Sequence, residues 1–225
     1  MNFAHVEAIV SAVLYEGYIL YPYRPSSVKN RQRWTFGGVY PRDYAAVDSS
    51  SPSRMQTEVL VSGDAETSLY IRVRFLHLVD RQVGAAVAGS IGAEAAFADV
   101  PSLTVGLRTF HSWEEVIERD IRLPVRRLVD LVDAAPIPFQ FAGERNVECL
   151  DGQNGAIVGM ITRTSAMIEG QIDVAAVEIE PGIYRLRIAI ENLTPLIAGE
   201  DARAAGQKKA LVSTHTILGV EGGAF

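Results

Sequence analysis

The residues best suited to recognition or chemistry gather near the N-terminus. Five of the eight tyrosines lie between residues 15 and 40, with several arginines and a tryptophan among them. These residue types are enriched at binding hot spots because each offers a large contact area with a polar tip. The segment from Tyr15 to Gly38 therefore predicts a surface that binds a partner protein or an anion. Its candidate residues are Glu16, Tyr18, Tyr21, Tyr23, Arg24, Lys29, Arg31, Arg33 and Trp34.

Two other interpretations of this segment stay open. Its arginines could stack on its own aromatic rings and pair with acids such as Glu16 or Asp43, which would make it a structural loop. Basic and aromatic residues also alternate in proteins that bind single-stranded nucleic acid. The net charge of −6 and the pI near 5.3 argue against nucleic acid and give no attraction to an anionic membrane. We therefore expect neither as a partner.

Familiar catalytic signatures are missing from the sequence. There is no glycine-rich dinucleotide fingerprint, P-loop, Gly-x-Ser-x-Gly elbow or His-Glu-x-x-His pair. The sequence therefore predicts no cofactor and identifies no catalytic residue. A catalytic site of another kind stays open.

The histidines and the cysteine do not have the spacing of a metal site. His5, His77, His111 and His215 are scattered along the chain. His77 and His215 fall in expected strands, where a hydrogen-bonded and partly buried imidazole is commoner than a metal ligand. A lone thiol such as Cys149 is more often a small packed side chain than a nucleophile. We expect no metal.

Cysteine content and hydrophobicity indicate the compartment. With one cysteine, no disulfide can form within the chain, which favours a reducing compartment. The first residues lack the basic start of a secretory signal. The stretch from Val83 to Val100 is too polar for a membrane span, since Ser90 and Glu94 interrupt it. These features predict a soluble, cytoplasmic protein without a membrane partner.

Two helices are expected. Apolar residues between Val6 and Leu14 recur at helical spacing, which predicts an amphipathic helix over residues 3–16 that lies on a sheet. Ser112 to Glu115 has the Ser-x-x-Glu form of a capping box and predicts a short helix to about Arg119. Acidic residues in such a first turn, Glu114, Glu115 and Glu118, are explained by the helix dipole without a catalytic role.

Alternation of apolar and polar residues from residue 57 onward predicts strands. It runs through Glu58 to Val61 and through Leu69 to Val79, with one face buried and the other solvated. The clearest hairpin lies between Ile168 and Ile190. Its turn at Glu180-Pro181-Gly182 places proline and glycine where a type II-like turn needs them.

The expected fold is mainly β, with a minor helical part. Antiparallel hairpins without regular strand-helix-strand alternation favour an antiparallel β-sandwich or an open barrel. We expect residues 1–47 to form an N-terminal helix and an aromatic, arginine-rich segment packed on the main domain. Residues 54–225 should form the antiparallel β domain, after the serine-rich run 48–53.

Two stretches resemble a known family. Leu14 to Arg24, with Lys29 to Arg31, Arg33 and Trp34, forms the first, and Ser213 to Leu218 forms the second. Together they resemble an uncharacterised bacterial family encoded beside NiFe-hydrogenase genes. The resemblance implies a role connected with hydrogenase, but it carries over no catalytic residue. It also implies a further C-terminal region beyond the Gly222 to Phe225 ending.

Two hypotheses follow for function. The first is a non-catalytic accessory protein that binds a partner protein, such as a hydrogenase subunit or maturation factor, through the Tyr15 to Gly38 segment. The second is an enzyme or small-anion-binding protein with a pocket near that segment. There Arg24, Arg31 or Arg33 would hold the anion and Glu16 would act as acid or base. The sequence does not indicate an oligomeric state.

Overall fold

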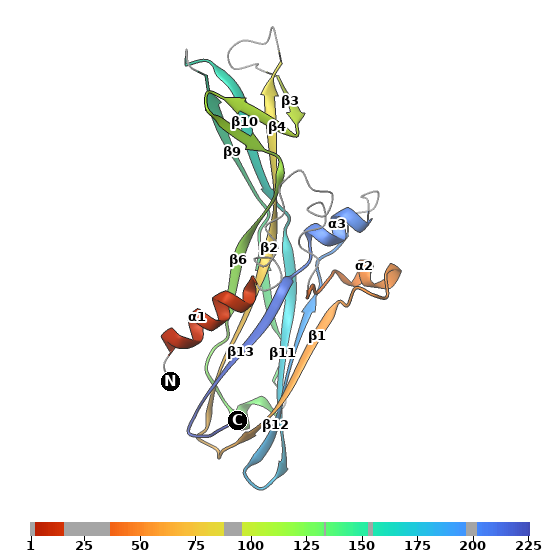
Figure 1. Cartoon of the computed structure of the whole chain (residues 1–225). Coiled ribbons are helices and arrows are strands. Elements are labelled where there is room, and N and C mark those ends of the chain that lie inside the picture. Colours follow the sequence, from red (N-terminus) through yellow and green to blue (C-terminus); the bar gives the residue numbers. More distant parts are fainter. Residues whose placement is uncertain (1–2, 16–36, 88–95, 133, 153–154, 197–201) are drawn as a thin grey trace.

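The fold was analysed in a computed structural model of the whole chain (Figure 1). The structure describes residues 3–15, 37–87, 96–132, 134–152, 155–196 and 202–225. The helices are α1 (Phe3–Leu14), α2 (Arg42–Val47), α3 (Ala202–Lys208) and the 3-10 helix η3 (Leu128–Leu131). The strands are β1 (Arg54–Ser62), β2 (Ser68–Ala86), β3 (Phe97–Val100), β4 (Ser102–Val105), β5 (Arg108–His111), β6 (Trp113–Arg122), β7 (Arg126–Arg127), β8 (Ile137–Phe141), β9 (Glu144–Asp151), β10 (Ile157–Ser165), β11 (Ile168–Glu180), β12 (Ile183–Asn192) and β13 (Val212–Glu221).

The expectation of a mainly β fold with antiparallel sheets is confirmed. One sheet has four strands in the order β1-β12-β11-β8, and every pair in it is antiparallel. The predicted hairpin is β11 with β12. Gly182 at its turn has a φ of +75°, in the left-handed region that glycine tolerates. The chain therefore reverses at the proline and glycine where the sequence predicted the turn.

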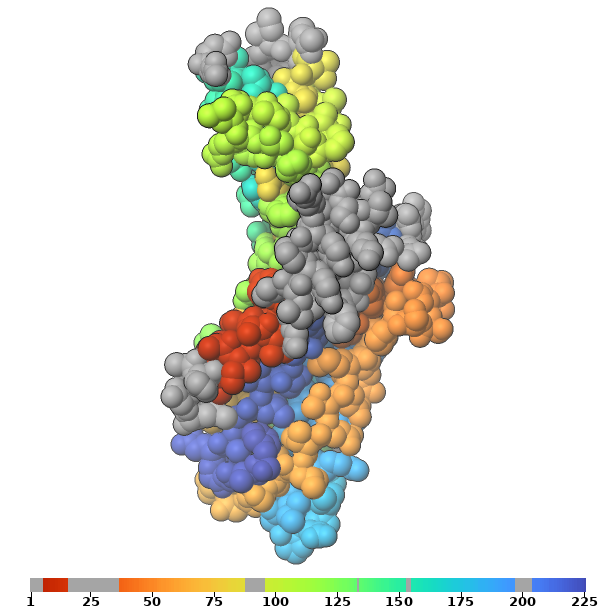
Figure 2. Space-filling view, viewed as in Figure 1, coloured from red at the N-terminus to blue at the C-terminus, as the bar shows by residue number. Residues whose placement is uncertain are grey.

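The second sheet is built around the 19-residue strand β2. In the first half of β2, β13 pairs with residues 68–76 and β6 with residues 72–81. Further along, β10 pairs with residues 79–85, so it overlaps β6 and must lie on the opposite edge of β2. The C-terminal part of β2 leaves the sandwich and forms a narrow arm with β3, β9 and β10, at the top of Figures 1 and 2.

The main core lies between the two sheets. From β2 it takes Val73 and Phe75, both fully buried, and from the hairpin Ile172, Leu186 and Ile188. These are the apolar positions that alternation in the sequence assigned to a buried face. A smaller apolar cluster around Val83, Leu150 and Ile161 fills the arm. β2 therefore contributes to both cores along its length.

The predicted helix from Ser112 to Arg119 is wrong, because this stretch is strand β6. It pairs residue by residue with β2 from Arg72 to Arg81. The Ser112 hydroxyl, instead of capping a helix, accepts a hydrogen bond from the Val83 amide and donates one to the Val100 carbonyl. The ladder with β2 outweighs the local capping signal, since tertiary pairing routinely overrides propensity.

The predicted N-terminal helix is confirmed as α1, which crosses the outer face of the sheet over β2 and β13 (Figure 1). The helices α2 and α3 were not expected. The serine-rich run after α2 begins at Asp48. The carboxylate of Asp48 accepts hydrogen bonds from the hydroxyls of Ser50 and Ser51, which makes this stretch a compact turn. Among the described residues, no helix has the length and apolar character that crossing a membrane requires.

Candidate functional site

The predicted binding residues lie outside the described part of the chain. Glu16, Tyr18, Tyr21, Tyr23, Arg24, Lys29, Arg31, Arg33 and Trp34 all fall within residues 16–36, so their assignment stays a prediction. The structure does describe the residues that precede and follow this segment. We call residues 16–36 the recognition segment.

The recognition segment begins where α1 is fixed to the sheet. Leu14, the last residue of α1, is fully buried and packs with Leu76 and Leu78 of β2. Tyr15 packs against the same cluster. Its hydroxyl donates a hydrogen bond of 2.9 Å to Oε1 of Glu118 on β6. Burial, followed by the bond to the Glu118 carboxylate, raises the pKa of Tyr15 to about 12, so this phenol stays protonated at neutral pH.

The recognition segment ends where the chain joins β13. Val39 and Leu211 exchange two backbone hydrogen bonds, each of 2.9 Å. Asn192, fully buried at the end of β12, donates from its side-chain amide to the carbonyls of Val39 (2.9 Å) and Lys209 (2.8 Å). Three separate stretches of chain are therefore joined through one side chain.

Both ends return to one apolar cluster. Tyr40, just after the Val39 bridge, packs against the group that also holds Leu14 and Tyr15. The shared members of this group are Leu76, Leu78, Ala210 and Val212. The described residues on either side of the recognition segment therefore rest on the same apolar patch of β2 and β13. Chain segments that start and end on a rigid sheet often carry binding residues.

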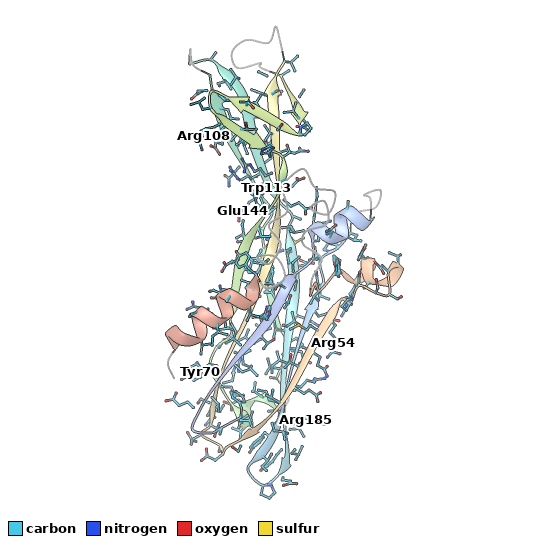
Figure 3. The ribbon with its side chains drawn as sticks, viewed as in Figure 1. Arg54, Tyr70, Arg108, Trp113, Glu144 and Arg185 are labelled. Carbon is cyan, nitrogen blue, oxygen red and sulfur yellow. The ribbon has the colours of Figure 1, made fainter. Side chains whose placement is uncertain are left out.

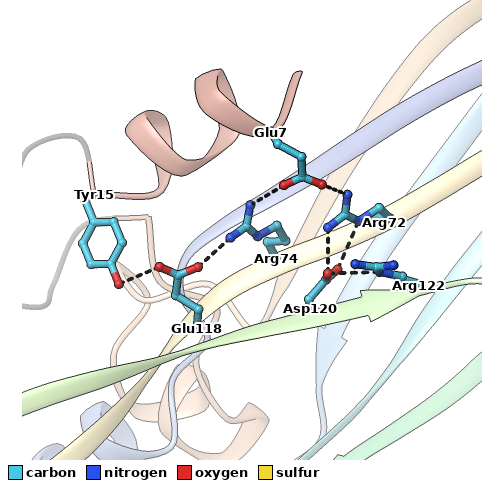
Figure 4. A network of polar contacts seen from close by, with 7 residues as sticks. All are labelled: Glu7, Tyr15, Arg72, Arg74, Glu118, Asp120 and Arg122. Carbon is cyan, nitrogen blue, oxygen red and sulfur yellow. Dashed lines mark hydrogen bonds and ion pairs between the residues drawn. The ribbon is translucent and has the colours of Figure 1, made fainter. Parts of the chain in front are cut away.

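An ion-pair network lies beneath α1 (Figure 4). Glu7 of α1 accepts hydrogen bonds from Arg72 and Arg74, which project from β2. Arg74 also donates to Glu118 at 2.5 Å. Since Tyr15 binds the same Glu118 carboxylate, the network links Glu7 within α1 to Tyr15, the residue that follows α1. Only 8% of the Arg74 side chain is exposed, so its charge depends on these carboxylates.

The network continues at Asp120. Arg72 pairs with Asp120 at 2.7 Å, and Arg122 pairs with the same carboxylate at 3.2 Å. Burial opposes ionisation of Asp120, but the hydrogen bonds from Arg72 and Arg122 outweigh it and lower its pKa. The pKa of Glu7 is lowered chiefly by its hydrogen bond from Arg72. Both groups are therefore carboxylates at neutral pH: Glu7 ties α1 to Arg72 and Arg74, and Asp120 holds Arg72 in place beneath it.

The contribution of Glu7 to stability should disappear in acid. A carboxyl group whose pKa is lower in the folded state stabilises the fold above its unfolded value, here 4.5, and loses that effect as the pH falls through the folded value. We expect Glu7→Gln to melt at a lower temperature than the wild type at pH 7. The difference should shrink as the pH falls from 4.5 to 3. Thermal melts across this range measure the difference, with the exposed Glu58→Gln as control. A difference in melting temperature between Glu7→Gln and the wild type that stayed constant from pH 7 to pH 3 would refute the network.

The comparisons with known proteins find nothing. No family model, curated protein or solved structure matches this chain. The link to hydrogenase therefore still depends on the resemblance alone.

Two of the histidines, His77 and His215, have structural contacts. His77 is fully buried and accepts a hydrogen bond of 3.3 Å from Arg119 at Nδ1. Burial, then the charge of Arg119, lowers its pKa to about 4, so it is neutral at pH 7. Nδ1 of His215 lies 2.7 Å from the Ser213 carbonyl. Within the described ranges, no group of three or more histidine, cysteine or acidic side chains could hold a metal ion.

Two expectations about single residues need correction. Cys149 is exposed on the edge strand β9 and is not packed in a core. Glu115 and Glu118, expected in a first helical turn, lie on strand β6 and pair with arginines of β2 and β10. Glu115 binds Arg81 and Arg163, each at 2.9 Å, and Glu118 binds Arg74. Sequence reasoning missed these pairs because their partners lie on other strands. The local signal for these ion pairs was the alternation of Arg72 and Arg74 with apolar residues along β2, which marks a polar face but not its partners.

Proposed function

We propose that the protein is a non-catalytic accessory protein that binds a partner protein through the Tyr15 to Gly38 segment. The observation that supports this most is the attachment of both ends of the recognition segment to one rigid patch. Fixing the chain on both sides of a binding segment lowers the entropy that binding must overcome. The arginines, tyrosines and tryptophan of the segment are the types that dominate binding energy at protein interfaces.

The partner that we propose is a NiFe-hydrogenase subunit or a hydrogenase maturation factor, in the cytoplasm. The support for the partner is the resemblance of Leu14 to Arg24 and of Ser213 to Leu218 to the hydrogenase-associated family. The support for the compartment is the single cysteine. Nucleic acid fits less well, since the chain carries a net charge of −6.

Arg31→Ala and Trp34→Ala should weaken binding without loss of stability. Truncating a hot-spot arginine or tryptophan commonly costs ~2 kcal/mol or more, which corresponds to about thirtyfold in the dissociation constant. Binding would be measured by surface plasmon resonance between the purified protein and purified hydrogenase subunits or maturation factors. Thermal melts of both variants should match the wild type.

The control is Arg185→Ala, which removes an exposed arginine from β12 (Figure 3). This variant should bind as tightly as the wild type. If Arg31→Ala and Trp34→Ala unfold at a lower temperature by several degrees, the segment is a structural loop. If none of the hydrogenase proteins binds the wild type, the proposed partner is wrong.

A further inference from the structure

A pocket opens at the end of the sandwich that lies far from the arm. It has a volume of about 290 Å³ and lies between β2 and β7 of one sheet and β11 of the other, beside η3. Its inner wall is made of core residues, Ile71, Leu131 and Val174, each at most 5% exposed. At the outer side lie the exposed side chains of Arg126 and Asp130. The pocket is therefore apolar at its base and charged at its mouth.

The two charged residues of the mouth are not equivalent. Asp130 is held by Arg127, whose guanidinium donates to both of its carboxylate oxygens at 3.0 and 3.1 Å. The hydrogen bond from Arg127 lowers the pKa of Asp130, so this acid is ionised and already neutralised by a partner. Among the described residues, no carboxylate forms an ion pair with Arg126. The mouth therefore presents one guanidinium, that of Arg126, without an ion-pair partner among the described residues, although its charge also helps to lower the pKa of Asp130.

We propose that this pocket binds a small amphiphilic carboxylate, such as a medium-chain fatty acid. The carboxylate would accept hydrogen bonds from the Arg126 guanidinium, whose planar fork matches a carboxylate. The hydrocarbon chain would lie against Ile71, Leu131 and Val174. This ligand class fits the pocket because ligand sites are apolar with a few placed polar groups, and at ~300 Å³ the pocket is at the small end of their range.

Other ligand classes fit less well. A cation would meet the unpaired charge of Arg126, and a highly charged anion such as a phosphate ester would find one arginine and an otherwise apolar wall. A neutral hydrocarbon would leave the guanidinium without a partner. This inference is independent of the proposed partner binding, because the recognition segment is attached to the patch of Leu76, Leu78 and Val212, which does not line this pocket.

Isothermal titration calorimetry with octanoate, octanol and octylammonium would test the proposal. We expect octanoate to bind the wild type, octanol to bind more weakly and octylammonium not to bind. Arg126→Gln should weaken octanoate binding by about tenfold, since a hydrogen bond to a charged group contributes ~1.5–3 kcal/mol, and the control Arg185→Gln should leave it unchanged.

A second variant tests the apolar half of the pocket. Ala134 lines it and is half-buried, so Ala134→Leu adds bulk inside while Arg126 is kept. This variant should lose octanoate binding while it melts near the wild-type temperature. The proposal is overturned if octanoate does not bind the wild type, or if octylammonium binds as well as octanoate. It is also overturned if Arg126→Gln or a folded Ala134→Leu binds octanoate like the wild type.

Discussion

Replacing Phe75 with alanine should lower the free energy of unfolding by about 4 kcal/mol, as expected for a large aromatic side chain removed from a core. Phe75 is fully buried on β2, between the two sheets. Its ring lies 5.7 Å from that of Phe141 in an edge-to-face arrangement and 6.4 Å from that of Phe139. Both partners come from β8, so the loss would weaken the contact between the sheets as well as leave a cavity.

Chemical denaturation in urea measures this effect. The control is Phe225→Ala, because Phe225 is 56% exposed and its loss should change stability by no more than about 0.5 kcal/mol. A double-mutant cycle of Phe75→Ala with Phe141→Ala should show a coupling of ~0.5–1.5 kcal/mol from the ring pair. A loss at Phe75 as small as that at Phe225 would contradict the packing described for the main core.

Phe141 also connects this core to the narrow part of the molecule. The guanidinium carbon of Arg119 lies 4.8 Å from the centre of the Phe141 ring, and Arg119 also donates to His77. The uncharged state of His77 is consistent with this arrangement, because a second positive charge would lie beside Arg119. The junction between the sandwich and the arm is therefore packed with an aromatic ring, a cation and a neutral imidazole.

Part of the backbone layout, the strands of the main core and their hairpin turn, could be predicted from local patterns in the sequence. Alternation placed Ile71, Val73 and Phe75 on a buried face, and the structure has all three in the core. The turn residues Pro181 and Gly182 located the β11–β12 reversal, since only a few residue types suit such a turn. These successes share a cause. Each depends on residues within a few positions of one another.

The polar partners could not be predicted in this way. Arg72 and Arg74 were expected to face solvent, yet α1 covers them and Glu7 binds both across separations of 65 and 67 positions. Alternation shows that a face is polar, but it does not show what covers that face. The capping-box error at Ser112 has the same origin, because the pairing of β6 with β2 is a long-range contact that no local motif records.

Replacing Asn192 with alanine should lower the free energy of unfolding by about 3 kcal/mol. The side chain serves three backbone groups in the interior: the carbonyls of Val39 and Lys209, to which it donates, and the amide of Thr194, from which its Oδ1 accepts at 3.0 Å. A buried polar group left without its partner costs ~1–3 kcal/mol. Asn192→Asp should be at least as harmful, since a carboxylate can accept from Thr194 but cannot donate to the two carbonyls.

The same substitution should weaken partner binding, because Asn192 fixes the point at which the recognition segment ends. Without it, Val39 keeps its bridge to Leu211 but loses its side-chain anchor, and the chain at Val39 gains freedom that binding must then remove. The matched control is Asn146→Ala, which removes an exposed asparagine from β9 and should alter neither property. Urea denaturation and surface plasmon resonance, below the melting temperature of the variant, separate the two effects. If Asn192→Ala is destabilised but binds the partner like the wild type, the attachment of this end does not contribute to recognition. If its stability is also unchanged, the three buried hydrogen bonds are not formed.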